Sequence, residues 1–301
     1  MLSSLTIRGW PRRVYPSTPF PHPFRHSYDE LNLAGGEPPY ILYSPRLRFG
    51  RYESTAKLLV WAGPRLACLD ARRGGVVTTV MSLDEIHEVE WGQALLEAWL
   101  RLASHGPGGR AVIRVELNAV GRDLYLPIAD AVRSQAYAGA HLSLADEGAR
   151  LSSLMATDYR FVGLGRQALF PGAELRRFWF QPHVSGSFLR VLDQTLVPAL
   201  LVMVTQAELI LVQEQSVRGA GRYGAVFSYL PLRSIRGVAL VSDPARAVVS
   251  LRFALPGGSE ARAVVASSSQ DALRAFLRET DPRWGGPQAQ PDLAPLEEES
   301  S

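Results

Sequence analysis

The sequence predicts a mainly β fold of the α+β class, in which two successive antiparallel units each end in one helix. Three observations lead to this prediction. Two apolar, β-branched runs surround a short polar turn at 199–214, a similar pair occurs at 58–70, and helical periodicity follows each series of strands. Short runs of this composition with turn residues between them are typical of β-hairpins.

The most apolar stretch, LLVMVTQAELILVQEQ at 200–215, raises the alternative of a membrane helix. A membrane-spanning helix needs about 20 apolar residues. The uninterrupted run from Leu196 to Val204 is much shorter and contains Pro198. We therefore predict a hairpin with strands 199–204 and 209–214, and in the same way a hairpin with strands 58–61 and 65–70.

Each of these segments has a counterpart in the other half of the chain. The paired segments are 34–45 with 170–182, 58–70 with 199–214, 76–89 with 223–238, 110–117 with 246–253, and 122–128 with 261–267. A common order of similar segments indicates an internal repeat, with about seven short strands in each copy.

Both series end in a helical pattern, ADAVRSQ at 129–135 and SQDALRAFLRET at 269–280. In the second, Ser269 is the expected N-cap, and Ala272, Ala275 and Phe276 are expected to share one face. A single amphipathic helix can cover the open end of a bent antiparallel sheet, so we expect each helix to cap its unit.

Two further segments have no counterpart. WGQALLEAWLRLASHGPGG at 91–109 reads as an insertion, and residues 93–103 fit a strand as well as a helix, because Ala98 and Leu102 satisfy both periodicities. Between the units, residues 141–169 begin with helical periodicity and predict a helical linker. The positions that show this periodicity are Leu144, Leu151, Leu154 and Met155.

The expected organisation follows from these segments. It comprises a flexible N-terminal tail at 1–30, a first unit at 31–140, a helical linker at 141–169, a second unit at 170–280 and a disordered acidic tail at 281–301. Both tails are rich in proline, and the C-terminal one carries five acids against one arginine. Such ends are usually poorly ordered.

Composition narrows the class of protein. The formal net charge is only +3, which gives no reason to expect a nucleic-acid partner. A single cysteine, Cys68, excludes a disulfide or a cysteine-based zinc site within one chain. The N-terminus lacks the apolar core of a secretory signal, so we expect a cytoplasmic protein.

Several motifs resemble the pleckstrin-homology (PH) superfold, especially bacterial PH-like domains. They are PGAE at 171–174 and GGE at 35–37 before a first strand, the hairpin VTQAELI at 204–210, and YLPLRSIRGV at 229–238. The first unit departs from the pattern where AGPR at 62–65 replaces the threonine turn. The resemblance covers about two thirds of the chain and implies two tandem PH-like barrels, each of about seven antiparallel strands capped by a C-terminal helix, joined by a helical linker.

The resemblance also directs attention to the loop RLRFGRYESTAK at 46–57, between the first two strands of the first unit. In eukaryotic PH domains this loop holds a phosphoinositide headgroup. Its four cations, Arg46, Arg48, Arg51 and Lys57, are the candidate ligand-binding residues here, for an anion or an anionic lipid headgroup. The alternative is an ordinary solvated loop.

The remaining polar residues do not converge on a catalytic or metal centre. In LDEIHEVE at 83–90, strand alternation places Asp84, Glu88 and Glu90 on one face and His87 with Glu85 on the other, which does not suit a metal. We expect Cys68 to be a small hydrophobic residue buried in the core. We also expect the protein to bind no cofactor.

The leading hypothesis is a non-catalytic binding, adaptor or regulatory protein with a protein partner. The alternatives are peripheral binding to anionic lipid at the inner membrane face through loop 46–57, and an enzyme with a site between the units.

Overall fold

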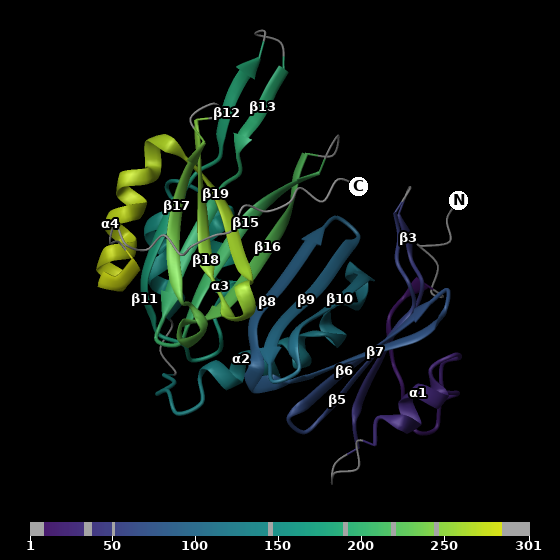
Figure 1. The fold of residues 1–301 in the computed structure, drawn as a ribbon. Coiled ribbons are helices and arrows are strands. Elements are labelled where there is room, and N and C mark those ends of the chain that lie inside the picture. Colours follow the sequence, from purple (N-terminus) through teal and green to yellow (C-terminus); the bar gives the residue numbers. More distant parts are fainter. Residues whose placement is uncertain are drawn as a thin grey trace.

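The structure of the protein is a computed structural model (Figure 1). It describes residues 9–32, 38–49, 52–143, 147–188, 192–217, 221–243 and 247–284. These residues form a mainly β fold with several antiparallel sheets, as predicted. No described helix has the length and apolar character needed to cross a bilayer.

The first sheet is built by the N-terminal half. Its strands, in spatial order, are β1 (Arg12–Arg13), β2 (Tyr40–Ser44), β5 (Lys57–Ala62), β6 (Arg65–Arg72) and β7 (Gly75–Ser82). A short pair, β3 (Arg48–Phe49) and β4 (Tyr52–Glu53), lies in the connection between β2 and β5. The predicted hairpin at 58–70 is confirmed, with Leu59 opposite Cys68.

A seven-stranded sheet joins the two halves of the chain. Its order is β10 (Gly109–Asn118), β9 (Glu97–Gly106), β8 (Ile86–Ala94), β16 (Gly221–Pro231), β15 (Glu208–Val217), β14 (Leu200–Thr205) and β11 (Leu175–Gln181). At the join, Trp91 of β8 lies opposite Phe227 of β16. The hairpin predicted at 199–214 is confirmed as β14 and β15, with Met203 opposite Ile210.

A third sheet follows in the C-terminal half, made of β17 (Gly237–Asp243), β18 (Val248–Ala254) and β19 (Glu260–Ala266). It lies in front of the seven-stranded sheet in Figure 1. The hairpin of β12 (Val184–Phe188) and β13 (Leu192–Val197) projects from the same half. The helices are α1 (Arg25–Glu30), α2 (Leu126–Ala136), α3 (Tyr159–Ala168) and α4 (Gln270–Thr280).

The two halves pass through their main elements in the same order. Each half has four meandering strands, a 3₁₀ turn, three further meandering strands and a helix. In the first half the strands are β2, β5, β6 and β7 and then β8–β10, and the helix is α2. In the second half they are β11 and β14–β16 and then β17–β19, and the helix is α4. Three details of the sequence comparison were wrong. Residues 91–109 contain the end of β8, the whole of β9 and the first residue of β10 rather than an insertion. Residues 110–117 therefore correspond to β19 instead of β18, and residues 122–128 are mainly helical rather than a strand.

None of the sheets formed by the described residues closes into a barrel, so this part of the expected fold was wrong. The physical reason lies in the strand edges. A closed barrel leaves no strand edge unpaired. Here β8 of the first half pairs with β16 of the second half, so each of these strands gains a neighbour at its otherwise unpaired edge. The strands of the two halves therefore form one continuous sheet, and neither half closes into a barrel.

Three apolar clusters hold these layers together. The largest includes Leu59 of the first sheet, Leu100 of β9 and Ile210 of β15, so it spans both halves. A second lies between the seven-stranded sheet and β17–β19, where α4 inserts Leu273, Phe276 and Leu277. The sequence prediction for the face of α4 that packs on the sheet is confirmed in part. Phe276 is buried, whereas Ala272 and Ala275, which were expected on the same face, are exposed. Ser269 occupies the N-cap position but its side chain makes no capping bond.

The third cluster corrects the expected flexible tail at 1–30. Phe24 is fully buried and Val14 nearly so, against the outer face of the first sheet. The backbone N–H of Val14 donates to the carbonyl of Ile41 at 2.9 Å. Residues 9–30 therefore form part of the folded structure, because the outer face of β2, β5 and β6 is apolar and needs a cover.

The expected linker at 141–169 contains a 3₁₀ helix, Glu147–Leu154, and α3. Leu151 and Leu154 are buried as their periodicity predicts, whereas Met155 is exposed and Leu144 lies outside the described residues. Of the expected C-terminal tail, Pro282–Trp284 forms a 3₁₀ turn and Trp284 is buried. Residues 285–301 lie outside the described part of the chain.

Candidate functional site

The structure places three of the four cations predicted to bind an anion. Arg46 pairs with Glu53 at 2.7 Å, and Arg48 is exposed on β3. Lys57 is largely buried, where its Nζ lies 3.3 Å from Oε2 of Glu116. Arg51 lies outside the described residues. The positive charges of Arg46 and Lys57 are therefore already balanced by carboxylates of the chain itself.

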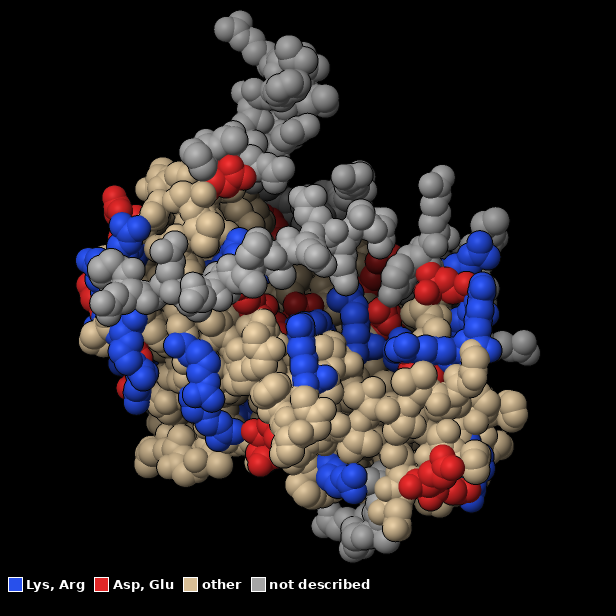
Figure 2. All heavy atoms as spheres, viewed as in Figure 1, with Lys and Arg blue, Asp and Glu red and all other residues tan. Residues whose placement is uncertain are grey.

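Basic side chains form a band across the face shown in Figure 2. Lysine and arginine side chains cross the middle of this face, with acidic side chains between them. Arg101 of β9 pairs with Glu88 of β8 at 2.6 Å, and Arg114 of β10 pairs with Glu116 at 3.1 Å. The face in Figure 2 therefore carries mixed charge and does not form a single-sign surface.

The candidate metal and nucleophile positions have ordinary structural surroundings. Asp84 and Glu85 lie in a 3₁₀ turn, Glu88 is ion-paired and His87 is buried. Within the described ranges no three potential ligands gather as a metal would require. Cys68 is buried as predicted, and burial raises the pKa of its thiol to about 12, so the thiol is protonated at neutral pH.

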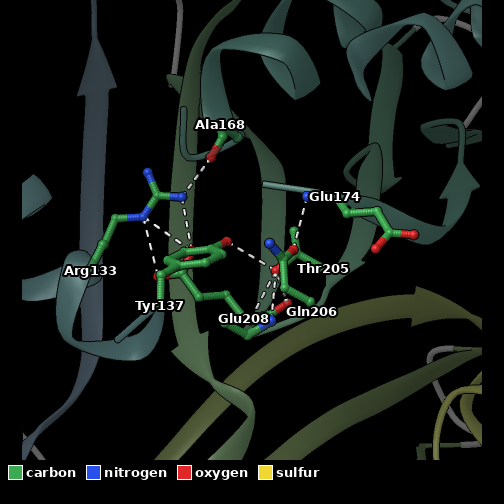
Figure 3. A network of polar contacts seen from close by, with 8 residues as sticks. Arg133, Tyr137, Ala168, Glu174, Thr205, Gln206 and Glu208 are labelled. Atoms are coloured by element: carbon green, nitrogen blue, oxygen red, sulfur yellow. Dashed lines mark hydrogen bonds and ion pairs between the residues drawn. The ribbon is translucent and has the colours of Figure 1, made fainter. Parts of the chain in front are cut away.

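A buried polar network connects α2 to the β14–β15 hairpin (Figure 3). Arg133 of α2 donates from Nη2 to Oε2 of Glu208 at 2.9 Å and to the carbonyl of Ala168 at 2.9 Å. Tyr137 donates to the same Glu208 carboxylate at 3.1 Å. Arg133 and Glu208 are 6% and 1% exposed, so a ligand cannot reach them without opening the interface.

Aromatic rings enclose this network. The Arg133 guanidinium lies 3.8 Å from the centroid of Tyr229, and Phe170 stacks on Tyr137 at 4.7 Å. Burial raises the pKa of Tyr229 to about 12. The network therefore fixes the α2 helix of the first half against the second half, and its role is structural. Nothing in the sequence relates Arg133 to Glu208, because they are far apart along the chain.

An arginine-rich groove lies beside β11, the end strand of the seven-stranded sheet. We call it the arginine groove and define it by Arg176, Arg177, Arg233 and Arg283 around a floor of Val204, Leu232 and Trp284. Its volume is about 400 Å³. A second hollow of about 490 Å³ shares Arg176 and Arg177 and extends along α4, where Ala272 and Ala275 line it.

The cations of the arginine groove differ in their partners. Arg283 pairs with Asp281 at 2.6 Å, and Arg177 pairs with Glu279. Arg233 donates from Nη1 to the carbonyl of Gln135 at 3.1 Å. Among the described residues neither Arg233 nor Arg176 has an acidic partner, so the groove carries net positive charge.

The backbone of β11 is the second feature of the arginine groove. Because β11 pairs with no strand other than β14 in the described part of the chain, one row of its backbone groups faces away from the sheet. Arg150 donates to the carbonyls of Leu175 and Arg176 at 2.8 and 3.4 Å, which covers the start of this edge. Arg177 and Phe178, the next two residues of β11, line the hollow along α4.

The sequence did not indicate this groove. Its residues come from β11, β14, the turn after β16 and the turn after α4, and in an arginine-rich chain no single one stands out. The only local signal was the pair Arg176-Arg177 at the start of a predicted strand. Comparisons give no independent guide, since the chain matches no protein-family model and no curated protein.

Proposed function

We propose that this protein is a non-catalytic binding protein of the cytoplasm, built from two PH-like units, whose arginine groove holds an extended acidic segment of a partner protein. The repeated order of seven strands and a helix supports the PH-like relationship, although the sheets join between units instead of closing. The single observation that carries the function is that β11 has no second strand neighbour among the described residues and borders a groove in which Arg176 and Arg233 have no acidic partner in that same part of the chain.

The occupant follows from the chemistry of the groove. Extended peptides bind to a sheet edge through backbone hydrogen bonds, and neighbouring side chains then decide which sequence is accepted. Arg176 and Arg233 favour carboxylates, because a guanidinium can donate two parallel hydrogen bonds to one carboxylate. The floor of Val204, Leu232 and Trp284 suits an apolar side chain between the acids.

The rival proposal is an anionic lipid headgroup bound by loop 46–57. The ion pairs of Arg46 and Lys57 weigh against it, since a headgroup would have to displace Glu53 and Glu116. Arg48 is exposed and has no acidic partner among the described residues, and one such charge contributes only about 1 kcal/mol at an anionic membrane.

The test uses a fluorescein-labelled peptide of alternating glutamate and valine, with glutamine–valine and lysine–valine peptides as references. We expect the full-length protein to bind the glutamate peptide alone, measured by fluorescence anisotropy. The double substitution Arg176→Glu/Arg233→Glu should weaken this binding by tenfold or more, because it replaces two attractions with two repulsions.

The matched control is Arg73→Glu/Arg110→Glu, which changes the net charge equally at two exposed positions outside the groove. Its affinity should stay within about twofold of the original. Equal losses in both double variants, or no binding of the acidic peptide, would overturn the proposal. So would flotation with phosphatidylserine vesicles that Arg48→Glu abolishes and the groove substitutions leave intact.

A further inference from the structure

A second concave site lies where the two halves of the chain meet. We call it the seam pocket. It has a volume of about 450 Å³, and its wall includes Arg122, Arg160, Leu164, Gln167, Ala225 and Phe227. Arg122 comes from the 3₁₀ turn after β10, the next three residues from α3, and the last two from β16. It shares no residue with the arginine groove.

The α3 helix forms a fixed wall of the seam pocket. Arg160, Leu164 and Gln167 are spaced by four and three positions, which places them on one face of the helix. The opposite face buries Phe161 and Val162 in the main core. On that side Gly165 packs so closely that an added Cβ would lie only 2.7 Å from the Leu151 side chain. The pocket is therefore shaped before any ligand enters.

The two arginines of the seam pocket differ in charge balance. Arg160 donates from Nη1 to Oε1 of Glu214 at 2.9 Å, and the Glu214 side chain is only 5% exposed. Arg122 lies over Trp91, with its guanidinium carbon 5.7 Å from the ring centroid. Among the described residues Arg122 has no acidic partner, and its buried Nε has no hydrogen-bond acceptor.

The neutral partner of Arg122 is Gln167. With the amide turned so that its oxygen faces the guanidinium, Gln167 accepts a hydrogen bond from Nη1 of Arg122 at 2.6 Å. An amide holds the guanidinium in place without cancelling its charge. With Arg160 balanced by Glu214, the pocket keeps about one positive charge above an apolar floor of Leu164, Ala225 and Phe227.

We infer that the seam pocket binds a small monocarboxylate with an apolar body. Pockets of a few hundred Å³ at the junction of two structural units, apolar with a few convergent polar groups, are the usual form of small-molecule sites. The carboxylate pairs with Arg122, and the apolar body lies against Leu164 and Phe227. One unbalanced charge selects a monoanion, because a doubly charged phosphate would keep one charge uncompensated in a partly apolar pocket.

Isothermal titration of the full-length protein with octanoate, 1-octanol and octylamine tests this inference. We expect octanoate to bind at least tenfold more tightly than either analogue of the same chain length. Arg122→Met should reduce octanoate affinity about 10- to 100-fold, the loss expected for one charge-assisted hydrogen bond, while thermal unfolding of the ligand-free variant reports whether it folds.

Two further variants keep the test decisive. Arg114→Met removes one charge at an exposed site on β10 and should leave octanoate binding unchanged. Leu164→Trp keeps every charge but fills the pocket from the exposed side of α3, and should abolish binding. Equal affinity for octanoate and octanol, equal losses in Arg122→Met and Arg114→Met, or unchanged binding in Leu164→Trp would each overturn the inference. Because the arginine groove is elsewhere, Arg176→Glu/Arg233→Glu should bind octanoate normally.

Discussion

At the scale of single residues, His87 couples stability to pH. Its side chain is 1% exposed on β8, at the irregularity in the pairing with β9. Burial lowers the pKa of His87 to about 4, against 6.5 for the unperturbed side chain. The folded chain therefore holds this imidazole neutral across the range in which an unfolded chain would protonate it.

We expect the free energy of unfolding to fall as pH decreases from about 6.5 to 4, because only the unfolded state gains a proton there. The full contribution is about 3 kcal/mol at 1.36 kcal/mol per pKa unit. Urea denaturation at several pH values should show a smaller decrease in His87→Leu than in the original protein.

The control for this prediction is His26→Gln, which alters a histidine that is 88% exposed. It should retain the pH dependence of the original protein. If His87→Leu and the original protein lose the same stability between pH 6.5 and 4, the buried neutral imidazole is not responsible.

Which charged side chains form ion pairs was the part of the structure least predictable from the sequence. The loop 46–57 was interpreted as a candidate anion site because Arg46, Arg48, Arg51 and Lys57 place four cations on one short segment. The carboxylate beside Lys57 is Glu116, which lies 59 positions later, on β10. Only the folded path of the chain brings these two together, so a local pattern of charge could not reveal that Lys57 is neutralised.

At the scale of elements, the contact between α2 and β15 depends on one buried ion pair. Arg133→Met should destabilise the protein by about 3–5 kcal/mol, because Glu208 would keep a buried charge without its cation. Chemical denaturation measures this loss. The double variant Arg133→Met/Glu208→Gln should lose less than the sum of the two single substitutions, since it leaves no unpaired charge.

An additive result in that double-mutant cycle would show that Arg133 and Glu208 do not depend on each other. A suitable control is Arg72→Met, which removes an arginine that pairs with Asp70 on the exposed end of β6. Exposed pairs typically contribute less than about 1 kcal/mol, so this variant should be close to the original in stability.

Hairpins were predictable because both their strands and their turns carry local signals. The ambiguous segment 93–103 shows the limit of such signals. Leu95 and Leu96 belong to the turn between β8 and β9, where they are 50% and 46% exposed, and Leu95 has a φ of 56°. Turns usually contain glycine, asparagine or aspartate. Two leucines there extended the apolar pattern across the turn and made helix and strand equally acceptable.

At the scale of the whole molecule, the largest apolar cluster contains residues from both halves and from the segment between them. We therefore expect one cooperative thermal transition rather than two. Leu59→Ala removes a buried side chain from this cluster and should cost about 2–5 kcal/mol. Differential scanning calorimetry should show the whole transition moving to lower temperature, with equal calorimetric and van't Hoff enthalpies.

Two separate transitions, of which only one moves in Leu59→Ala, would contradict a shared core. Leu273→Ala in the second cluster provides the matched comparison, because it removes an equally buried leucine from the C-terminal half. Both variants should shift a single peak. The repeat in the sequence suggested two independent barrels, and it could not reveal that strands of different repeats would pair.

The pairing of β8 with β16 also affects the chain while it is being synthesised, because β8 emerges before its partner strand exists. A ribosome completes β8 long before it reaches β16, and β11, β14 and β15 are translated in between. During that interval the nascent chain presents a strand whose outer edge has no partner. Open edges of this kind recruit strands from other molecules. Stalled or prematurely terminated chains that end before Gly221 should therefore associate with one another, while the finished polypeptide satisfies that edge internally.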